Sequence, residues 1–139
     1  NICKNFTIEE IDIPIKENFT MINPNFDKVV EVCKSVGLDE EIMKLEKGYD
    51  TIVDENTPLS MSSKKLLVIV RMLLSESKVL LIDDVINVLE EKHEKRLMDL
   101  LMEMKKDHTI LIVTHSKRIT SRADKILEVT TNGVVEIGK

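Results

Sequence analysis

Two short apolar runs, separated by a long amphipathic stretch, dominate the pattern of hydrophobic and polar positions in this chain. The run from Lys78 to Val85 reads Lys-Val-Leu-Leu-Ile-Asp-Asp-Val, and the run from Thr109 to Val113 reads Thr-Ile-Leu-Ile-Val. Each run predicts a strand buried on both faces, as in the centre of a parallel sheet. Residues 90–106 predict a helix whose apolar face comprises Leu97, Met98, Leu101 and Met104. Both strands of such a βαβ unit should end at one edge of the sheet.

Helical spacing also marks the chain before these strands. Residues 27–36 and 39–47 predict two short helices, each ended by a glycine. A third, strongly apolar helix follows Ser60, which is a plausible N-cap. The first 18 or so residues alternate loosely between apolar and polar, and Pro14 limits them to an edge strand or an extended loop.

The end of the chain predicts a hairpin. A short helical segment over 116–122 leads to two apolar runs, 125–129 and 134–137, which are joined at Thr131-Asn132-Gly133. Asn-Gly between two apolar runs is typical of a hairpin turn. We therefore expect an antiparallel pair at the margin of the sheet.

Chemically useful side chains follow both central strands. Asp83 and Asp84 end the first strand, and His115 follows the second. Ligands of open α/β sheets bind outside the carboxyl ends of the strands, so these acids stand where a metal ion or a reacting water would be handled. The simpler alternative is that they only cap the following helix. Ser60 likewise either caps its helix or opens an anion site at the positive end of the helix dipole.

Composition narrows the function classes. The 139 residues are 42% hydrophobic and 32% charged, with a formal net charge of −5. This is typical of one globular domain and gives no basic footprint for nucleic acid. No stretch approaches the ~20 apolar residues of a membrane-spanning helix. Cys3 and Cys33 lack metal-ligand spacing and favour a reducing, cytoplasmic setting. His93 and His108 have polar surroundings and are expected to be solvated.

Five segments carry the candidate residues in a fixed order: Leu59–Lys64 (Leu-Ser-Met-Ser-Ser-Lys), Val79–Asp83, Asp84, Asn87–Glu90 (Asn-Val-Leu-Glu) and His115. This order resembles the nucleotide-binding domain of exporter-type ATP-binding cassette (ABC) transporters. The segments are similar to the LSGGQ-K signature, Walker B, the catalytic glutamate, the D-loop and the switch histidine of that family. The resemblance extends over nearly the whole chain.

The resemblance implies an α/β fold with a P-loop NTPase-like, mostly parallel sheet, flanking helices and a small helical subdomain. Residues 1–139 would form part of one nucleotide-binding domain. About 18–77 would be its helical and signature region, and about 78–139 would run from Walker B to the C-terminal part of the sheet.

The resemblance also implies roles for individual residues. Asp83 would hold Mg²⁺ through water, Asp84 would polarise the attacking water, and His115 would contact the γ-phosphate of ATP. The signature residues would face ATP held by a second nucleotide-binding domain, in a homodimer or a heterodimer. A transmembrane domain would hold the chain at the cytoplasmic face of a membrane. The signature residues are Leu59, Ser60, Met61, Ser62 and Ser63, and the D-loop residues are Asn87, Val88, Leu89 and Glu90.

Departures from the family pattern are also informative. The chain contains neither a G-x-x-x-x-G-K-[ST] motif nor any glutamine, and we expect the P-loop to lie upstream of what is a processed or cut-out piece. Met61 and Ser62 replace the signature glycines, and their side chains should crowd an approaching phosphate. Asp84 is one methylene shorter than glutamate, so hydrolysis should be weak or absent.

These observations favour two functions. The chain is predicted to be part of the ATP-binding and ATP-hydrolysing domain of an ABC exporter, where it would couple ATP-driven domain pairing to transport. The alternative is a degenerate, non-hydrolysing regulatory domain that pairs with a competent partner. A weaker third possibility is a stand-alone interaction module. The 139-residue chain by itself is expected to be inactive.

Overall fold

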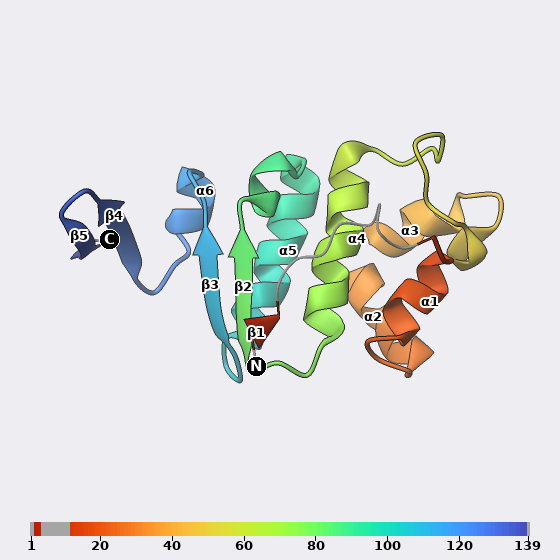
Figure 1. The fold of residues 1–139 in the computed structure, drawn as a ribbon, viewed down its shortest axis with the longest axis horizontal. Coiled ribbons are helices and arrows are strands. Elements are labelled where there is room, and N and C mark those ends of the chain that lie inside the picture. The colour runs from red at the N-terminus through yellow and green to blue at the C-terminus, as the bar shows by residue number, and fades with distance from the viewer. Residues whose placement is uncertain (1, 4–11, 139) are drawn as a thin grey trace.

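The computed structural model describes residues 2–3 and 12–138 of the chain (Figure 1). It combines a small parallel sheet with helices, so the α/β class is confirmed. In chain order the elements are β1 (Ile2–Cys3), α1 (Ile15–Thr20), α2 (Phe26–Ser35), α3 (Leu38–Met43), the 3-10 helix η2 (Gly48–Asp50), α4 (Met61–Leu74), β2 (Val79–Asp83), the 3-10 helix η3 (Val85–Val88), α5 (Glu91–Met104), β3 (Thr109–Val113), α6 (Lys117–Thr120), β4 (Ile126–Thr130) and β5 (Gly133–Ile137).

The parallel sheet has the order β1-β2-β3, with β2 in the centre. The register of β2 against β3 runs from Val79 opposite Thr109 to Asp83 opposite Val113. The predicted strand–helix–strand unit is therefore confirmed, and both strands end at one edge, as expected. Sequence periodicity succeeded here because two apolar runs and an amphipathic stretch of the right length leave few alternatives.

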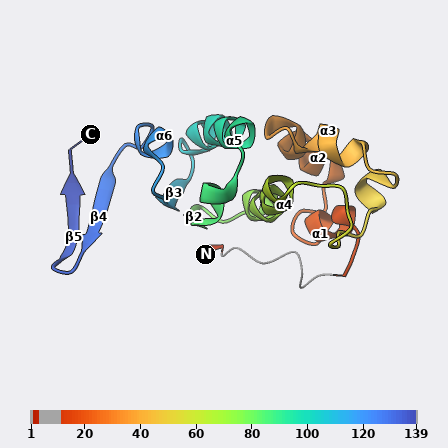
Figure 2. The ribbon, with the colours of Figure 1, turned by 90° about the horizontal axis from the view of Figure 1, so that it is seen from above.

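Both strands were predicted to be buried on both faces, and for the described residues this prediction is wrong. Leu80 and Ile82 are fully buried, but Leu111 and Val113 on β3 are 51% and 45% exposed. Figure 2 shows α5 on one side of β2 and β3. A strand covered on one face alternates between a more and a less buried side. β2 accordingly alternates between half-buried and buried positions before its exposed last residue, and β3 alternates between exposed and half-buried positions.

The helical part, α1 to α4 with η2, packs around a continuous apolar core. Ile15, Phe19 and Cys33 are fully buried in it. The rings of Phe26 and Tyr49 meet edge to face at 5.3 Å, and the Tyr49 hydroxyl donates to Asp39 Oδ1 at 2.7 Å. These contacts hold α2, α3 and η2 together. None of the helices in the described part of the chain is long and apolar enough to cross a membrane.

Two predictions for this region need correction. The extended segment predicted for the first 18 or so residues ends at Pro14, because Ile15 begins α1 and turns its apolar side chain into the core. Residues 4–11 of that segment lie outside the described residues. The helix predicted over 39–47 ends at Met43, because the chain then tightens into turns that bury Leu45.

The predicted hairpin is confirmed. β4 and β5 pair in antiparallel register around Thr131 and Asn132, and Gly133 has φ +123°. The hairpin forms a separate two-stranded sheet rather than extending the parallel one, and in Figures 1 and 2 it lies beyond α6. Its apolar side chains are exposed, including Leu127, Val129 and Val134.

Candidate functional site

The start of α4 is built around Ser60. Its hydroxyl oxygen accepts a hydrogen bond from the Ser63 backbone N–H at 3.0 Å, and its carbonyl accepts from the Lys64 N–H at 3.0 Å. This is the predicted N-cap, which satisfies backbone donors that have no partner within the helix. The 14-residue α4 thus begins at the predicted place.

The signature-like side chains divide into exposed and buried ones. Met61 is 64% exposed, whereas Ser62 and Ser63 are 3% and 0% exposed. Ser62 was expected to crowd an approaching phosphate, but its hydroxyl points inward to His93 Nδ1 at 2.6 Å and accepts from the Glu90 N–H at 2.8 Å. Of the two replacements of glycine, only Met61 projects into solvent.

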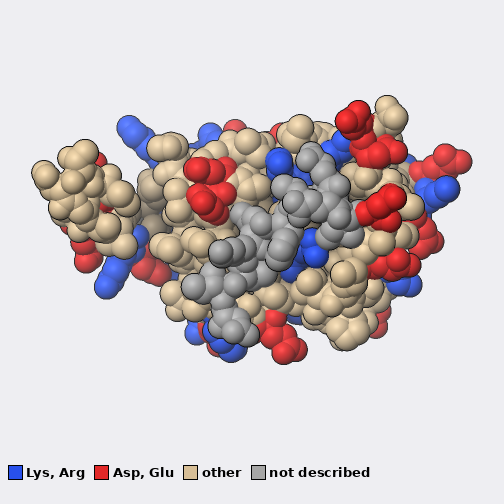
Figure 3. Space-filling view, in the orientation of Figure 1, with Lys and Arg blue, Asp and Glu red and all other residues tan. Residues whose placement is uncertain are grey.

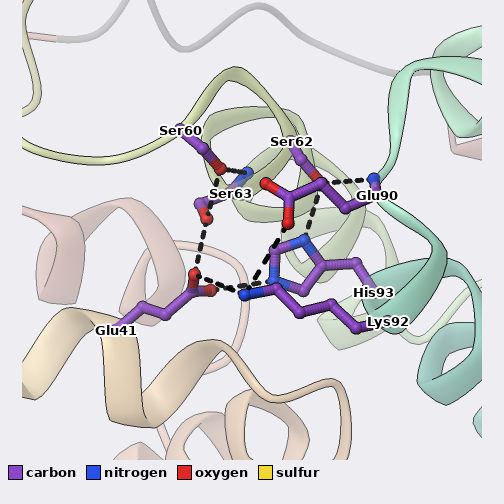
Figure 4. Close-up of polar contacts among 7 residues, drawn as sticks. All are labelled: Glu41, Ser60, Ser62, Ser63, Glu90, Lys92 and His93. Carbon is purple, nitrogen blue, oxygen red and sulfur yellow. Dashed lines mark hydrogen bonds and ion pairs between the residues drawn. The ribbon is translucent and has the colours of Figure 1, made fainter.

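His93 was predicted to be solvated, and this is wrong, because its side chain is only 2% exposed. It lies between Ser62 and Glu41, whose Oε2 is 2.9 Å from His93 Nε2 (Figure 4). One sequence signal could have placed it. His93 stands four residues before Leu97 and therefore belongs to the apolar face of α5. His108 is half-buried, with Nδ1 3.0 Å from the Met104 carbonyl oxygen.

One placement of the hydrogens satisfies every hydrogen-bonding group of this cluster. A carboxylate oxygen accepts, so His93 Nε2 carries the hydrogen that bonds to Glu41. The lone pair of Nδ1 then accepts the hydroxyl hydrogen of Ser62, and Ser62 Oγ accepts from the Glu90 N–H. With the hydrogens placed in this way, no group of this set lacks a partner.

A serine, a histidine and a glutamate in contact also resemble a nucleophilic triad. Ser62 cannot work in that way here, because both it and His93 are almost completely buried. Its oxygen is already engaged by the Glu90 N–H and its hydrogen by His93. The cluster therefore links structural elements and does not offer a nucleophile to a substrate.

The second candidate region is the edge where β2 ends. Asp83 and Asp84 are both exposed. Asp84 has φ +51°, and the described residues contain no other positive φ outside glycine. Its N–H donates to the Val113 carbonyl at 3.2 Å, and its Oδ1 accepts from Asn87 Nδ2 at 3.1 Å. The alternative of a side-chain helix cap is not seen, because Asp84 caps η3 through its backbone only.

His115 lies at the same edge, after β3. Thr114 Oγ1 donates to Asn87 Oδ1 at 2.7 Å and joins the two loops that follow β2 and β3. An open hollow there is lined by Asn87, Leu89, Glu94, His115, Ser116, Lys117 and Arg118. The structure thus brings His115 beside the D-loop-like residues. Asp83 and Asp84 share the edge through the strand register but do not line the hollow.

Two of the charged side chains that line this hollow form an ion pair with each other. Arg118 Nε donates to Glu94 Oε1 at 3.0 Å, and the pair ties α6 to α5. The hydrogen bond and charge of Glu94 raise the pKa of Arg118. On the face shown in Figure 3, acidic side chains form separate groups, and basic side chains lie between them and at the margins.

Asp83 is the residue that the sequence predicts as a metal ligand. Within residues 2–3 and 12–138, no three His, Cys, Asp or Glu side chains come together as a metal site. Mg²⁺ is commonly held by one or two carboxylates together with substrate phosphates and water. A single exposed carboxylate at the strand end fits that pattern.

Comparisons with known proteins are consistent with this arrangement. No protein-family model matches the chain. Multidrug export ATP-binding/permease proteins from two strains of Staphylococcus aureus are 35% and 34% identical to it over 127 residues, which cover 89% of this chain and 22% of each relative. A solved bacterial Atm1-family ABC exporter with ATP bound is similar in fold, with a TM-score of 0.74 and 23% identity over 84% of this chain and 21% of that one. The chain therefore spans about a fifth of the proteins that it matches.

Proposed function

Because the chain is a homologue of the ATP-binding/permease proteins of ABC exporters, we propose that it is part of the ATP-binding and ATP-hydrolysing domain of such an exporter. The observation that carries the proposal is sequence identity of 35% over 89% of the chain. In the whole protein, this domain would lie at the cytoplasmic face of the membrane and pair with a second one when ATP binds, and the pairing would drive a transmembrane domain.

The edge after β2 and β3 supplies the proposed chemistry. Asp83 would hold Mg²⁺ through water, and the ion would neutralise charge on the phosphoryl group being transferred. Asp84 would orient the attacking water, and His115 would donate a hydrogen bond to the γ-phosphate. The hydrogen bonds from Asp84 to the Val113 carbonyl and from Thr114 to Asn87 support these roles, because they fix the two loops to each other.

The segment Leu59–Ser63 would face ATP held by the partner domain. Ser60 and Met61 are the exposed members of this segment, and Leu59 is half-buried. A phosphate would therefore meet the free N–H groups at the start of α4 and the thioether of Met61. The regulatory alternative is favoured by one observation. Met61 replaces a glycine and is 64% exposed, so it stands where a phosphate would have to approach closely.

The test is ATP hydrolysis by the full-length protein that contains this chain. His115→Ala is expected to abolish turnover, whereas His108→Ala, a histidine outside the proposed site, should leave it unchanged. Asp84→Glu should raise turnover, because the longer side chain restores the reach of the base.

The outcomes separate the two functions. Unchanged turnover in His115→Ala would remove His115 from the site. A wild-type protein that binds ATP without hydrolysing it, and that Asp84→Glu does not activate, would be the regulatory domain instead of the hydrolase.

A further inference from the structure

We propose that His93 is a positioning residue, which holds the start of α4 and the end of the D-loop-like segment in one fixed arrangement. His93 belongs to a chain of contacts that we call the His93 relay, which comprises Glu41, Ser60, Ser62, Ser63 and His93. Its functional meaning rests on the proposed role of Leu59–Ser63 in facing a nucleotide. The relay itself is a feature of the described contacts and can be tested separately.

The first branch of the relay runs from His93 to the D-loop-like segment. His93 Nδ1 accepts the hydroxyl hydrogen of Ser62 at 2.6 Å, and Ser62 Oγ accepts from the Glu90 N–H at 2.8 Å. Glu90 is the residue just before α5, and its side chain provides no cap for that helix. The hydroxyl of Ser62 therefore ties the last D-loop-like residue to the second residue of α4.

The second branch runs from His93 to Ser60. His93 Nε2 donates to Glu41 Oε2 at 2.9 Å, and Glu41 Oε1 accepts the hydroxyl hydrogen of Ser63 at 3.0 Å. Because that hydrogen is used, the 2.9 Å contact between Ser60 Oγ and Ser63 Oγ must be a donation from Ser60. The exposed N-cap hydroxyl is thus oriented by a chain that begins at His93.

Both branches pass through buried groups that depend on one another. Ser62, Ser63 and His93 are each at most 3% exposed, so water has little access to these three side chains, whereas Glu41 is 24% exposed and also lies 3.9 Å from Lys92 Nζ. Buried polar networks stabilise one arrangement when every member is satisfied and lose that advantage when one is missing. Figure 4 shows the three elements α3, α4 and α5 meeting at this cluster. Removing His93 should therefore release Glu90 and Ser60 together.

Hydrogen exchange in the full-length protein tests the relay directly. In His93→Ala, peptides that cover residues 60–66 and 87–92 should exchange about tenfold faster, as expected when a buried hydrogen bond is lost. Peptides of α2 should keep their rates. The matched control is His108→Ala, a half-buried histidine of the same chain, which should leave both regions unchanged. Unchanged rates near Ser63 and Glu90, or an equal rise over α2, would overturn the proposal.

A pair of further variants separates the branches. Ser62→Ala should accelerate exchange near Glu90 and leave Ser63 protected, because it breaks only the first branch. Combining it with His93→Ala should add little near Glu90, since both changes act on the same branch. Additive effects of the two changes near Glu90 would contradict a shared link.

A functional experiment measures the ATP concentration at which association of the two nucleotide-binding domains is half-maximal. His93→Ala should raise the half-maximal ATP concentration about tenfold, and His93→Gln, which keeps a donor and an acceptor on one side chain, should restore part of it. An unchanged concentration in His93→Ala would exclude the positioning role. If the wild-type protein shows no ATP-dependent association, the proposed function fails, and hydrogen exchange still decides whether the relay exists.

Discussion

Asp84 adopts a backbone conformation that most side chains avoid. Its φ is +51°, and the Asn87 amide donates to its carboxylate. Aspartate tolerates the left-handed region through such local hydrogen bonds, whereas a residue without them pays about 1–2 kcal/mol. We therefore expect Asp84→Ala to lower the free energy of unfolding by about 1–2 kcal/mol, measured by urea denaturation.

The neighbouring residue provides the control. Asp83 is also exposed but lies in the extended strand β2, so Asp83→Ala should change the free energy of unfolding by no more than about 0.5 kcal/mol. Equal effects of the two substitutions would mean that the conformation at Asp84 carries no strain.

The buried thiol of Cys33 is expected to lower the stability of the fold at alkaline pH. Burial raises the pKa of its thiol to about 12, while the hydrogen bond with Tyr49 lowers it and the nearby Asp39 raises it. The unfolded chain then loses the thiol proton near its ordinary pKa of 9.0, while the folded chain keeps it until about pH 12. Ionisation therefore favours the unfolded state above about pH 9. The free energy of unfolding should fall as the pH rises from 9 toward 12.

Urea denaturation at about pH 8 and about pH 10.5 measures this fall, and Cys33→Ala should reduce it. Some slope should remain, because burial and the hydrogen bond to Asp39 also raise the pKa of Tyr49. An equal slope in the variant would show that Cys33 does not contribute.

At the scale of single elements, the hairpin β4–β5 depends on Gly133. Its φ of +123° is open to glycine but strained for any other residue, although a Cβ there would meet nothing within 4 Å. A lone hairpin is only marginally stable. Gly133→Ala should therefore accelerate amide exchange in β4 and β5 and leave the main unfolding transition unchanged.

Gly138→Ala is the matched control, since Gly138 also faces open space but has no positive φ. Equal exchange rates in the two variants would show that the positive φ at position 133 does not limit the stability of the hairpin.

The success of prediction for these elements follows from their periodicity. α4, α5, β2, β3 and the hairpin were predicted, because each combines a regular pattern with a cap or a turn residue. α1 was missed because Pro14, read as a mark of an edge strand, stands at the N-cap position of a helix. His93 was missed because a polar residue beside charged neighbours looks exposed, and its partners Glu41 and Ser62 are distant in sequence.

At the scale of the whole molecule, burial depends on what covers each surface. Leu111 and Val113 have the same apolar character as Leu80 and Ile82, yet only the last two are buried. Sequence identifies an apolar strand, but the tertiary packing decides which face is covered. For the same reason the motif order predicted one edge for Asp83, Asp84 and His115, while the hollow beside His115 could be found only in the structure.

The sequence of the whole chain predicts that its affinity for ATP is low. It contains no G-x-x-x-x-G-K-[ST] loop, and such loops supply most backbone N–H groups that hold ATP phosphates. Isothermal titration of the 139-residue chain with Mg-ATP should therefore show no binding in the micromolar range. Micromolar affinity would mean that this chain binds the nucleotide without that loop.

The His93 relay also constrains how this sequence can evolve. Glu41, Ser62 and His93 are far apart along the chain, but a change of Glu41 or Ser62 leaves a buried nitrogen of His93 without a partner, and a change of His93 leaves the buried Ser62 hydroxyl without one. Glycine at position 62 would leave His93 Nδ1 without its partner, and loss of His93 would leave the hydroxyl of Ser62 without its own. Lineages should therefore exchange these residues as a group or through tolerant intermediates. Related sequences with glycine at position 62 should also lack histidine at position 93.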